Sequence, residues 1–203
     1  MPFCLQCGHA ANFAIPVGDS RPRLVCPACQ FIHYENPKII CGTLCYHQDK
    51  ILLCKRAIEP RYGYWTLPAG FMENGETMLA GAVRETFEEA QATACNARLY
   101  CLFDIAHLGQ VHAIYLAKLS DDGYFAAGAE SLECALVDDD NINWDTLAFE
   151  TIRQTIKHYL ADKQALIRQG IDANDPSNYP LHQITLGDDT TPSQMATKLS
   201  KES

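Results

Sequence analysis

The stretch Gly70–Glu89, GFMENGETMLAGAVRETFEE, decides how the rest of this sequence is interpreted. From Thr77 to about Ala90 its apolar residues recur at the spacing of one helix face. We therefore expect a helix here, preceded by a turn that contains two glycines. The side chains expected on the buried face of this helix are those of Leu79, Val83, Thr86 and Ala90.

The other side of the expected helix carries acidic residues. At 100° per residue, Glu85, Glu88 and Glu89 fall within about a third of the circumference. Like charges three or four residues apart destabilise a helix by about 0.2 to 0.5 kcal/mol per pair, and Arg84 relieves this only in part. Carboxylate oxygens at this spacing suit Mg²⁺ or Mn²⁺, which share their remaining positions with water and phosphate oxygens. A solvated acidic face is the alternative.

Strand patterns lie on both sides of this stretch, and a second helical pattern follows them. The runs 39–46 and 50–56 are rich in β-forming residues, and the polar segment between them predicts a hairpin. A second helix is expected from 146 to about 168. Strands mixed with two helices favour an α/β sandwich. Further strands are expected at 64–68, 98–108, 110–119 and 134–137.

Two C-x2-C pairs stand near the N-terminus, Cys4 with Cys7 and Cys26 with Cys29, separated by eighteen residues. This spacing is typical of structural zinc sites, in which four thiolates close a tetrahedron and leave no open position. The surrounding segment is too poor in apolar residues to fold on a core of its own, so we expect zinc to stabilise it. The other six cysteines are expected to be buried, inert thiols: Cys41, Cys45, Cys54, Cys95, Cys101 and Cys134.

The composition restricts the class of partner. Lys+Arg 16 against Asp+Glu 25 gives a formal net charge of −9, which disfavours nucleic acid and anionic membranes and favours a small ligand. No apolar run approaches the ~20 residues that cross a bilayer, and no signal-peptide pattern opens the chain. We therefore expect a cytoplasmic protein that binds neither nucleic acid nor membrane.

The spacing of Gly70, Glu76, Arg84, Glu85 and the pair Glu88-Glu89 resembles the Nudix box of the Nudix hydrolases. Members of that family cleave nucleoside diphosphates linked to another moiety. The resemblance implies a Nudix α/β/α sandwich with a mixed sheet, preceded here by a small N-terminal zinc ribbon. Domains are then expected at 1–36 for the ribbon, 37–168 for the Nudix hydrolase domain and 169–203 for a polar C-terminal tail.

The resemblance extends beyond the box to a zinc-ribbon subgroup of bacteria and plant plastids. It includes Asn36-Pro37-Lys38, the segment 65–70 and the segment 130–134, and covers residues 1 to about 165. The implied reaction is Mg²⁺- or Mn²⁺-dependent cleavage of FAD, ADP-ribose or both to AMP plus FMN or ribose 5-phosphate. Pro68-Ala69-Gly70 favours these substrates, because the members that hydrolyse nucleoside triphosphates carry two glycines there.

The resemblance also assigns roles to single residues. Glu85, Glu89, Glu88 and the backbone carbonyl of Ala69 are the implied ligands of the catalytic Mg²⁺. The implied catalytic group consists of Glu88, Glu130, Arg84 and Glu76. In that group Arg84 and Glu76 form an orienting ion pair, and Glu130 is the expected base, with Glu133 or Glu88 as alternatives. The candidates for phosphate contact, or for stacking on a base or flavin, are Arg56, Arg61, Tyr62 and Phe103.

Two residues depart from the family pattern. The box continues with a glycine and an aliphatic residue, but Gln91 and Ala92 stand in those places. Because that glycine ends the helix in a left-handed conformation, we expect Gln91 to end it differently or to extend it.

Two other functions stay open. An NADH pyrophosphatase also joins a zinc ribbon to a Nudix box, but that group carries a motif of tryptophan and proline after the box, and residues 93–112 contain neither. A Nudix-like sensor would bind ADP-ribose or a flavin without turnover, and the intact acidic cluster argues against it. A homodimer is expected from the apolar run 39–46 and from the habit of the family.

Overall fold

The computed structural model describes residues 2–187 and divides the chain into two compact units, residues 1–37 and 38–203. The smaller unit is a three-stranded antiparallel sheet in the order β1-β2-β3. Its buried residues are Cys4, Ala11 and Cys26, with Leu24 and Phe31 packed against them. This small core agrees with the expectation that apolar burial alone does not hold the segment together. The strands are β1 (Asn12–Ala14), β2 (Arg23–Val25) and β3 (Ile32–His33).

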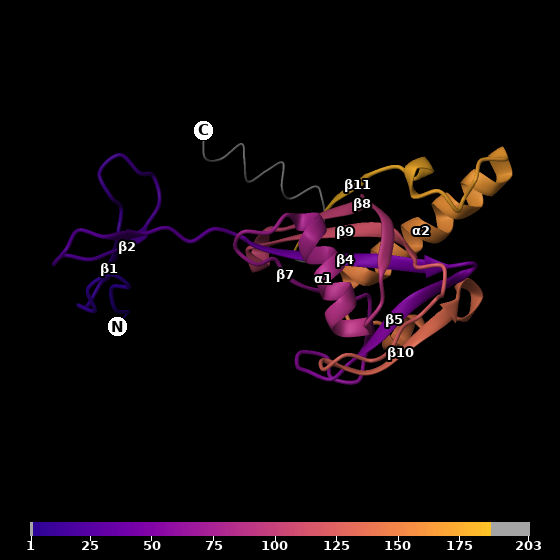
Figure 1. The fold of residues 1–203 in the computed structure, drawn as a ribbon. Helices are drawn as coiled ribbons and strands as arrows, with labels where there is room; N and C mark the ends of the chain where they lie inside the picture. Colours follow the sequence, from indigo (N-terminus) through magenta and orange to yellow (C-terminus); the bar gives the residue numbers. More distant parts are fainter. Residues whose placement is uncertain (1, 188–203) are drawn as a thin grey trace. The chain divides into compact units, whose positions relative to one another are not determined.

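The larger unit is built on a mixed sheet in the order β10-β5-β4-β9-β8-β11 (Figure 1). The pairs β4 with β9 and β8 with β11 are parallel, and the other pairs are antiparallel. Two short strands extend the sheet, because β6 pairs with β5 and β7 pairs with β4. The strands are β4 (Lys38–His47), β5 (Lys50–Arg56), β6 (Trp65–Thr66), β7 (Ala69–Phe71), β8 (Ala94–Ile105), β9 (Gln110–Leu119), β10 (Ser131–Asp138) and β11 (His182–Thr185).

The helices α1 (Met78–Ala90) and α2 (Glu150–Gln169) cover opposite faces of this sheet. Two successive residues of β5 show this arrangement, since successive side chains of a strand point to opposite faces. Leu52 packs in one cluster with Ala90 of α1, whereas Leu53 packs in the other with Ile156 of α2. The expected α/β/α sandwich with a mixed sheet is therefore confirmed. Short 3-10 helices are η1 (Ala106–Leu108), η2 (Asp139–Asn141), η3 (Trp144–Thr146) and η4 (Pro176–Asn178).

The hairpin between the two expected strands is present, with His47 paired to Lys50 across the turn. The second helix starts later than its pattern suggested. Residues before it are held in extended backbone, because Ala148 donates its N–H to the Trp65 carbonyl at 2.8 Å. The helix then ends at Gly170, whose positive φ of 71° is the usual conformation of a C-terminal cap.

The segment expected to be a polar tail differs from that expectation at its start. Strand β11 joins the sheet beside β8, with His182 opposite Cys101 and Ile184 opposite Phe103. Ile184 and Leu186 pack against the main core. The His182 ring also lies 2.7 Å from an Asp162 carboxylate oxygen on α2, so apolar and polar contacts together place this edge strand. The rest of the expected tail, residues 188–203, lies outside the described residues. No helix within residues 2–187 is long and apolar enough to cross a membrane.

Candidate active site

Helix α1 buries Thr86 and Ala90 as expected from the sequence, but its buried face is turned away from Leu79 and toward Glu89. Its buried residues are Gly81, Ala82, Thr86, Glu89 and Ala90, while Leu79 is 40% exposed and Phe87 is 60% exposed. The hydroxyl of Thr86 fixes this orientation, because it lies 2.7 Å from the Thr43 hydroxyl on β4 and donates to the Ala82 carbonyl. Small residues let the helix approach the sheet closely, so Glu89 is brought into the interior.

Arg84 organises the acidic groups around it. Its guanidinium donates to both Glu76 oxygens, at 2.8 and 3.1 Å, and to the Phe71 carbonyl at 3.1 Å. The same group donates to Glu85 at 2.7 Å and to Glu88 at 2.9 Å. The hydrogen bonds from Arg84 lower the pKa of Glu76 to about 2. Arg84 therefore holds three carboxylates in fixed positions, including the Glu76 partner expected from the sequence.

Glu85 and Glu89 are the desolvated carboxylates of the cluster. Only 7% of Glu89 is exposed, and burial raises its pKa to about 8, with a further increase from the charge of Glu85. Burial also raises the pKa of Glu85, and Arg84 opposes that shift. Two desolvated carboxylates in one cluster are costly unless a cation compensates their charge. The donor set, two or three carboxylates beside backbone oxygens, fits Mg²⁺ or Mn²⁺.

Strand β7 explains the glycine of the motif. A Cβ atom at Gly70 would overlap the Glu85 carboxyl group, so only glycine allows this carboxylate to lie against the strand. The adjacent residue, Ala69, makes a backbone hydrogen bond to Glu89 that partly offsets the rise in its pKa. The backbone of β7 therefore lies beside both buried carboxylates. The sequence pattern did not predict this three-residue strand as a separate element.

Glu130 is brought to the same cluster by the loop that precedes β10. Its charge raises the pKa of both Glu85 and Glu89. The loop is attached to the end of α1, because Gly128 donates its N–H to the Glu89 carbonyl at 2.9 Å. A Cβ at Gly128 would overlap the Glu88 carbonyl, which makes this contact specific for glycine. Glu133, the alternative base, instead forms an ion pair with Lys55 at 3.7 Å.

Three of the four substrate-binding candidates lie at one end of β5. The charge of Arg56 lowers the pKa of Glu89, so its guanidinium is close to the cluster. Arg61 lies over the Tyr64 ring, 5.4 Å from its centroid. Tyr62, beside it, is 55% exposed. This loop combines two cations with an accessible aromatic ring.

Phe103 requires a correction. It is fully buried in the main core between β8 neighbours and α2, and no face of its ring is accessible to a base or a flavin. The sequence could not distinguish an aromatic residue on the inner face of a long strand from one that contacts a ligand.

Gln91 also behaves differently from the expectation. It neither extends the helix nor ends it by another geometry, but itself adopts the left-handed conformation with φ of 47°. Its N–H donates to the Phe87 carbonyl at 2.7 Å, as the family's glycine would. The loop after the helix therefore starts in the conformation that the glycine provides, and Ala92 is buried.

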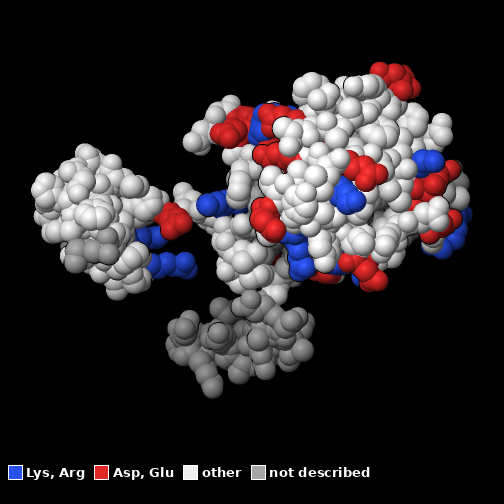
Figure 2. All heavy atoms as spheres, turned by 90° about the horizontal axis from the view of Figure 1, so that it is seen from below, with Lys and Arg blue, Asp and Glu red and all other residues white. Residues whose placement is uncertain are grey.

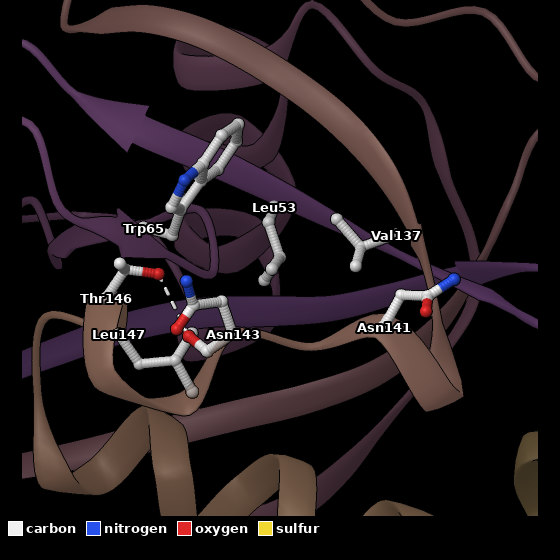
Figure 3. Close-up of a pocket in the computed structure, with 7 residues that line it drawn as sticks. All are labelled: Leu53, Trp65, Val137, Asn141, Asn143, Thr146 and Leu147. Atoms are coloured by element: carbon white, nitrogen blue, oxygen red, sulfur yellow. Dashed lines mark hydrogen bonds between the residues drawn. The ribbon is translucent and has the colours of Figure 1, made fainter.

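A cavity of about 160 Å³ lies on the α2 side of the sheet, away from the carboxylates (Figure 3). Trp65, expected to be a core residue, is half-buried and forms one wall with Leu53. Figure 3 shows Asn143 and Thr146 on the facing loop, where the Thr146 hydroxyl donates to the Asn143 carbonyl at 2.9 Å. No sequence pattern indicated this cavity. Its remaining lining residues are Val137, Asn141 and Leu147.

In the smaller unit the four paired cysteines come together. Their sulfur atoms all lie within 4.8 Å of one another, with Cys4 and Cys29 at 3.7 Å and Cys7 and Cys26 at 3.5 Å. Four sulfurs bound to one zinc at about 2.3 Å would be about 3.8 Å apart in a tetrahedron, so the arrangement fits that metal. Gly8 has a positive φ of 73° and donates its N–H to the Cys4 carbonyl, which closes the first turn.

Comparison with known proteins agrees with this arrangement. The family model described as Nudix N-terminal, a zinc ribbon, matches residues 2–35, and the NUDIX domain model matches residues 37–153. The crystal structure of a NUDIX hydrolase from Nitrosomonas europaea is 42% identical, with a TM-score of 0.81, and the match covers 93% of this chain and 100% of that chain.

More distant relatives share parts of the chain. The NAD-capped RNA hydrolase NudC of Edwardsiella ictaluri is 35% identical over 97 residues, which are 47% of this chain and 35% of the relative. This chain therefore spans about a third of the length of such curated relatives. A bifunctional NMN adenylyltransferase/ADP ribose pyrophosphatase from Francisella tularensis shares the fold, with a TM-score of 0.56 at 21% identity over 64% of this chain and 42% of that chain.

Proposed function

Because this chain belongs to the NUDIX hydrolase family, we propose that it is a metal-dependent pyrophosphatase that cleaves the diphosphate of FAD, ADP-ribose or both. The products would be AMP plus FMN or ribose 5-phosphate. The observation that carries this proposal is the desolvated pair Glu85 and Glu89 beside the β7 backbone, with Glu85 bound by Arg84 and with Glu130 close to both.

In this proposal Glu85, Glu89, Glu88 and the Ala69 carbonyl hold Mg²⁺ or Mn²⁺. When bound, the metal neutralises the charge on the diphosphate and makes a water molecule more acidic. Arg84, anchored by Glu76, keeps the ligand carboxylates in place. Glu130 accepts the proton of the attacking water at its carboxylate, since it is exposed at the edge of the cluster. The water oxygen ends on one phosphate and the bridging oxygen leaves with the other.

The same site accounts for recognition of an anionic dinucleotide by an acidic protein. In this proposal Arg56, whose charge acts on Glu89, and Arg61 contact the diphosphate, and the exposed ring of Tyr62 stacks on a base or flavin. Figure 2 shows acidic side chains spread over one face of the larger unit, with isolated basic side chains between them and no continuous basic stripe on that face. This surface favours a small substrate over a long nucleic acid.

An NAD-type substrate is the second candidate, and it is supported by the relatives named NAD-capped RNA hydrolase. Against it, residues 93–112 lack the tryptophan and proline motif of the NADH pyrophosphatases. A ligand sensor without turnover is a third candidate, which the complete carboxylate set disfavours. We also propose a homodimer, and a monomeric mass in light scattering would contradict that part of the proposal.

The substrate is tested by measuring kcat/KM in parallel, with Mg²⁺ present, for AMP release from FAD, ADP-ribose and NADH and for release of nicotinamide mononucleotide from an NAD-capped RNA. We expect FAD or ADP-ribose to exceed NADH by about tenfold or more, which corresponds to about 1.4 kcal/mol of transition-state discrimination. A higher value for NADH or the capped RNA would transfer the assignment to the second candidate. Tight binding without any turnover would support the sensor.

A further inference from the structure

The structure brings together two of the six cysteines that the sequence predicts to be separate, inert thiols. Cys54 on β5 stands directly opposite Cys134 on β10 in the antiparallel register. Their sulfur atoms are 3.5 Å apart. No other contact between two thiols of the larger unit this short is found among the described residues.

This thiol pair adjoins the proposed metal site through the backbone of α1. The Cys134 thiol donates to the carbonyl of Glu89 at 3.5 Å. Both cysteines pack with Ala90, the last residue of the helix. The pair therefore lies directly beneath the helical turn that carries the most buried carboxylate.

The two thiols differ in accessibility. Cys54 is 1% exposed, whereas Cys134 is only partly buried, so an oxidant reaches Cys134 first. The hydroxyl of Ser131 lies beside both sulfurs, is buried, and has no hydrogen-bond partner by oxygen or nitrogen among the described residues. It is a polar group available to an oxidised sulfur. The site thus contains an accessible thiol and a resolving thiol.

We propose that Cys54 and Cys134 form an oxidant-sensitive dithiol, and that its closure to a disulfide lowers the hydrolase activity at the neighbouring carboxylates. The second part rests on the proposed function. With a peroxide as oxidant, the Cys134 sulfur takes one peroxide oxygen to become a sulfenic acid, and one water leaves. The Cys54 sulfur then displaces that oxygen as a second water. Two thiols and one hydrogen peroxide give one disulfide and two waters, with two electrons passing to the peroxide.

The register of the two strands permits this bond. Directly opposed residues of an antiparallel pair have Cα atoms about 4.5 to 5.5 Å apart, and disulfides bridge Cα separations of about 4.4 to 6.8 Å. The sulfurs must approach from 3.5 Å to about 2.05 Å, which draws β5 and β10 together below α1. A displacement of about 1 Å near a catalytic group can reduce a rate by up to about 10²-fold.

The experiment exposes the full-length protein to increasing hydrogen peroxide, blocks the remaining thiols and digests with trypsin. Cys54 and Cys134 then fall in the peptides 51–55 and 119–153, each with a single cysteine, so the ribbon cysteines do not interfere. We expect a cross-linked pair of these peptides, formed in parallel with a fall in AMP release of about tenfold or more. Both changes should reverse with a thiol reductant.

Variants separate the parts of the proposal. Cys134→Ser, or Cys134→Ala if the first fails to fold, should keep the activity of the reduced protein and resist peroxide. Cys95→Ser is the matched control and should remain sensitive, because Cys95 is also partly buried but lies outside the pair. Absence of the cross-link in the wild type would overturn the dithiol. A cross-link with unchanged activity would overturn its coupling to the carboxylates. Inactivity of the reduced protein toward every dinucleotide would instead contradict the proposed function.

Discussion

At the scale of single residues, burial separates the roles of the carboxylates. Glu89 is 7% exposed, whereas the side chain of its neighbour Glu88 on the same helix is 55% exposed. The buried group is suited to hold a cation, since a cation relieves the cost of its charge. The exposed groups at the edge of the cluster are suited to exchange protons with water.

Glu130 and Glu133 provide a direct test of the base. Glu130→Gln should lower kcat by about 10² to 10⁴-fold with a small change in KM, because a positioned base contributes about this much. Glu133→Gln, which removes a surface ion pair with Lys55, should leave kcat nearly unchanged. Steady-state kinetics on ADP-ribose measures both variants. Equal losses in the two variants, or a loss only in Glu133→Gln, would move the base to Glu133.

The raised pKa of Glu89 predicts how stability depends on pH when no Mg²⁺ is added. In the folded protein the pKa of Glu89 is about 8, whereas in the unfolded chain this side chain loses its proton near its ordinary pKa of 4.5. The native state therefore holds more protons between these values, and the free energy of unfolding must fall as pH rises. Glu89→Gln removes this dependence. As pH rises from 5 to 8, the free energy of unfolding of the variant should therefore increase by on the order of 3 kcal/mol relative to that of the wild type.

Urea titrations followed by tryptophan fluorescence measure this difference, because Trp65 and Trp144 both lie in the larger unit. Added Mg²⁺ should stabilise the wild type and leave the variant nearly unchanged, which reverses the order at pH 8. A difference between the two proteins that does not vary with pH would show that Glu89 is not the group that titrates.

At the scale of elements, the end of α1 depends on a residue that is poorly suited to its conformation. Gln91 adopts φ of 47°, which is costly for any residue with a Cβ. Gln91→Gly should therefore raise the free energy of unfolding by about 0.5 to 1 kcal/mol, and Gln91→Ala should give no gain. Urea midpoints of the three proteins measure the effect. Destabilisation by glycine would mean that the Gln91 side chain makes a stabilising contact.

The elements also show what the sequence could and could not predict. Long strands with β-branched residues and the helix 78–90 were predictable, since their patterns repeat over many residues. The buried face of α1 was predictable only in part: Thr86 and Ala90 are buried as expected, but the pattern favoured Leu79 over Glu89. The small residues Gly81 and Ala82 allow the close approach that buries Glu89. The strands β7 and β11 are too short to produce a pattern. Phe103 was misassigned for a different reason: it lies on a long strand, and which face of that strand is buried depends on tertiary packing.

At the scale of the whole molecule, the two units are stabilised by different physical means. The larger unit has hydrophobic clusters on both faces of its sheet, and the smaller unit has three buried apolar residues and four converging sulfurs. We expect one zinc per chain. Structural zinc sites of this type supply folding free energy directly, and their domains unfold when the metal is removed.

Loss of zinc should therefore unfold the smaller unit and leave the larger one folded. The rate of tryptic cleavage after Arg23 reports whether the smaller unit is folded, because Arg23 lies in β2 and forms an ion pair with Asp19 at 3.0 Å. Cys7→Ser with Cys29→Ser should abolish zinc binding and make the bond after Arg23 rapidly cleavable, while the tryptophan fluorescence of the larger unit stays native. Cys95→Ser is the control and should resist cleavage. Slow cleavage in the zinc-free variant would show that the ribbon folds without metal.

The most direct test of the whole account is Mg²⁺-dependent release of AMP from ADP-ribose or FAD by wild type and Glu89→Gln. Glu150→Gln on α2 is the matched control, because it removes an exposed carboxylate on the opposite face of the sheet. We predict release that requires added Mg²⁺, a loss of about 10³-fold or more in Glu89→Gln, and an unchanged rate in Glu150→Gln. Turnover that persists in Glu89→Gln, or that proceeds equally without metal, would contradict the assignment of the buried carboxylates as the hydrolytic centre.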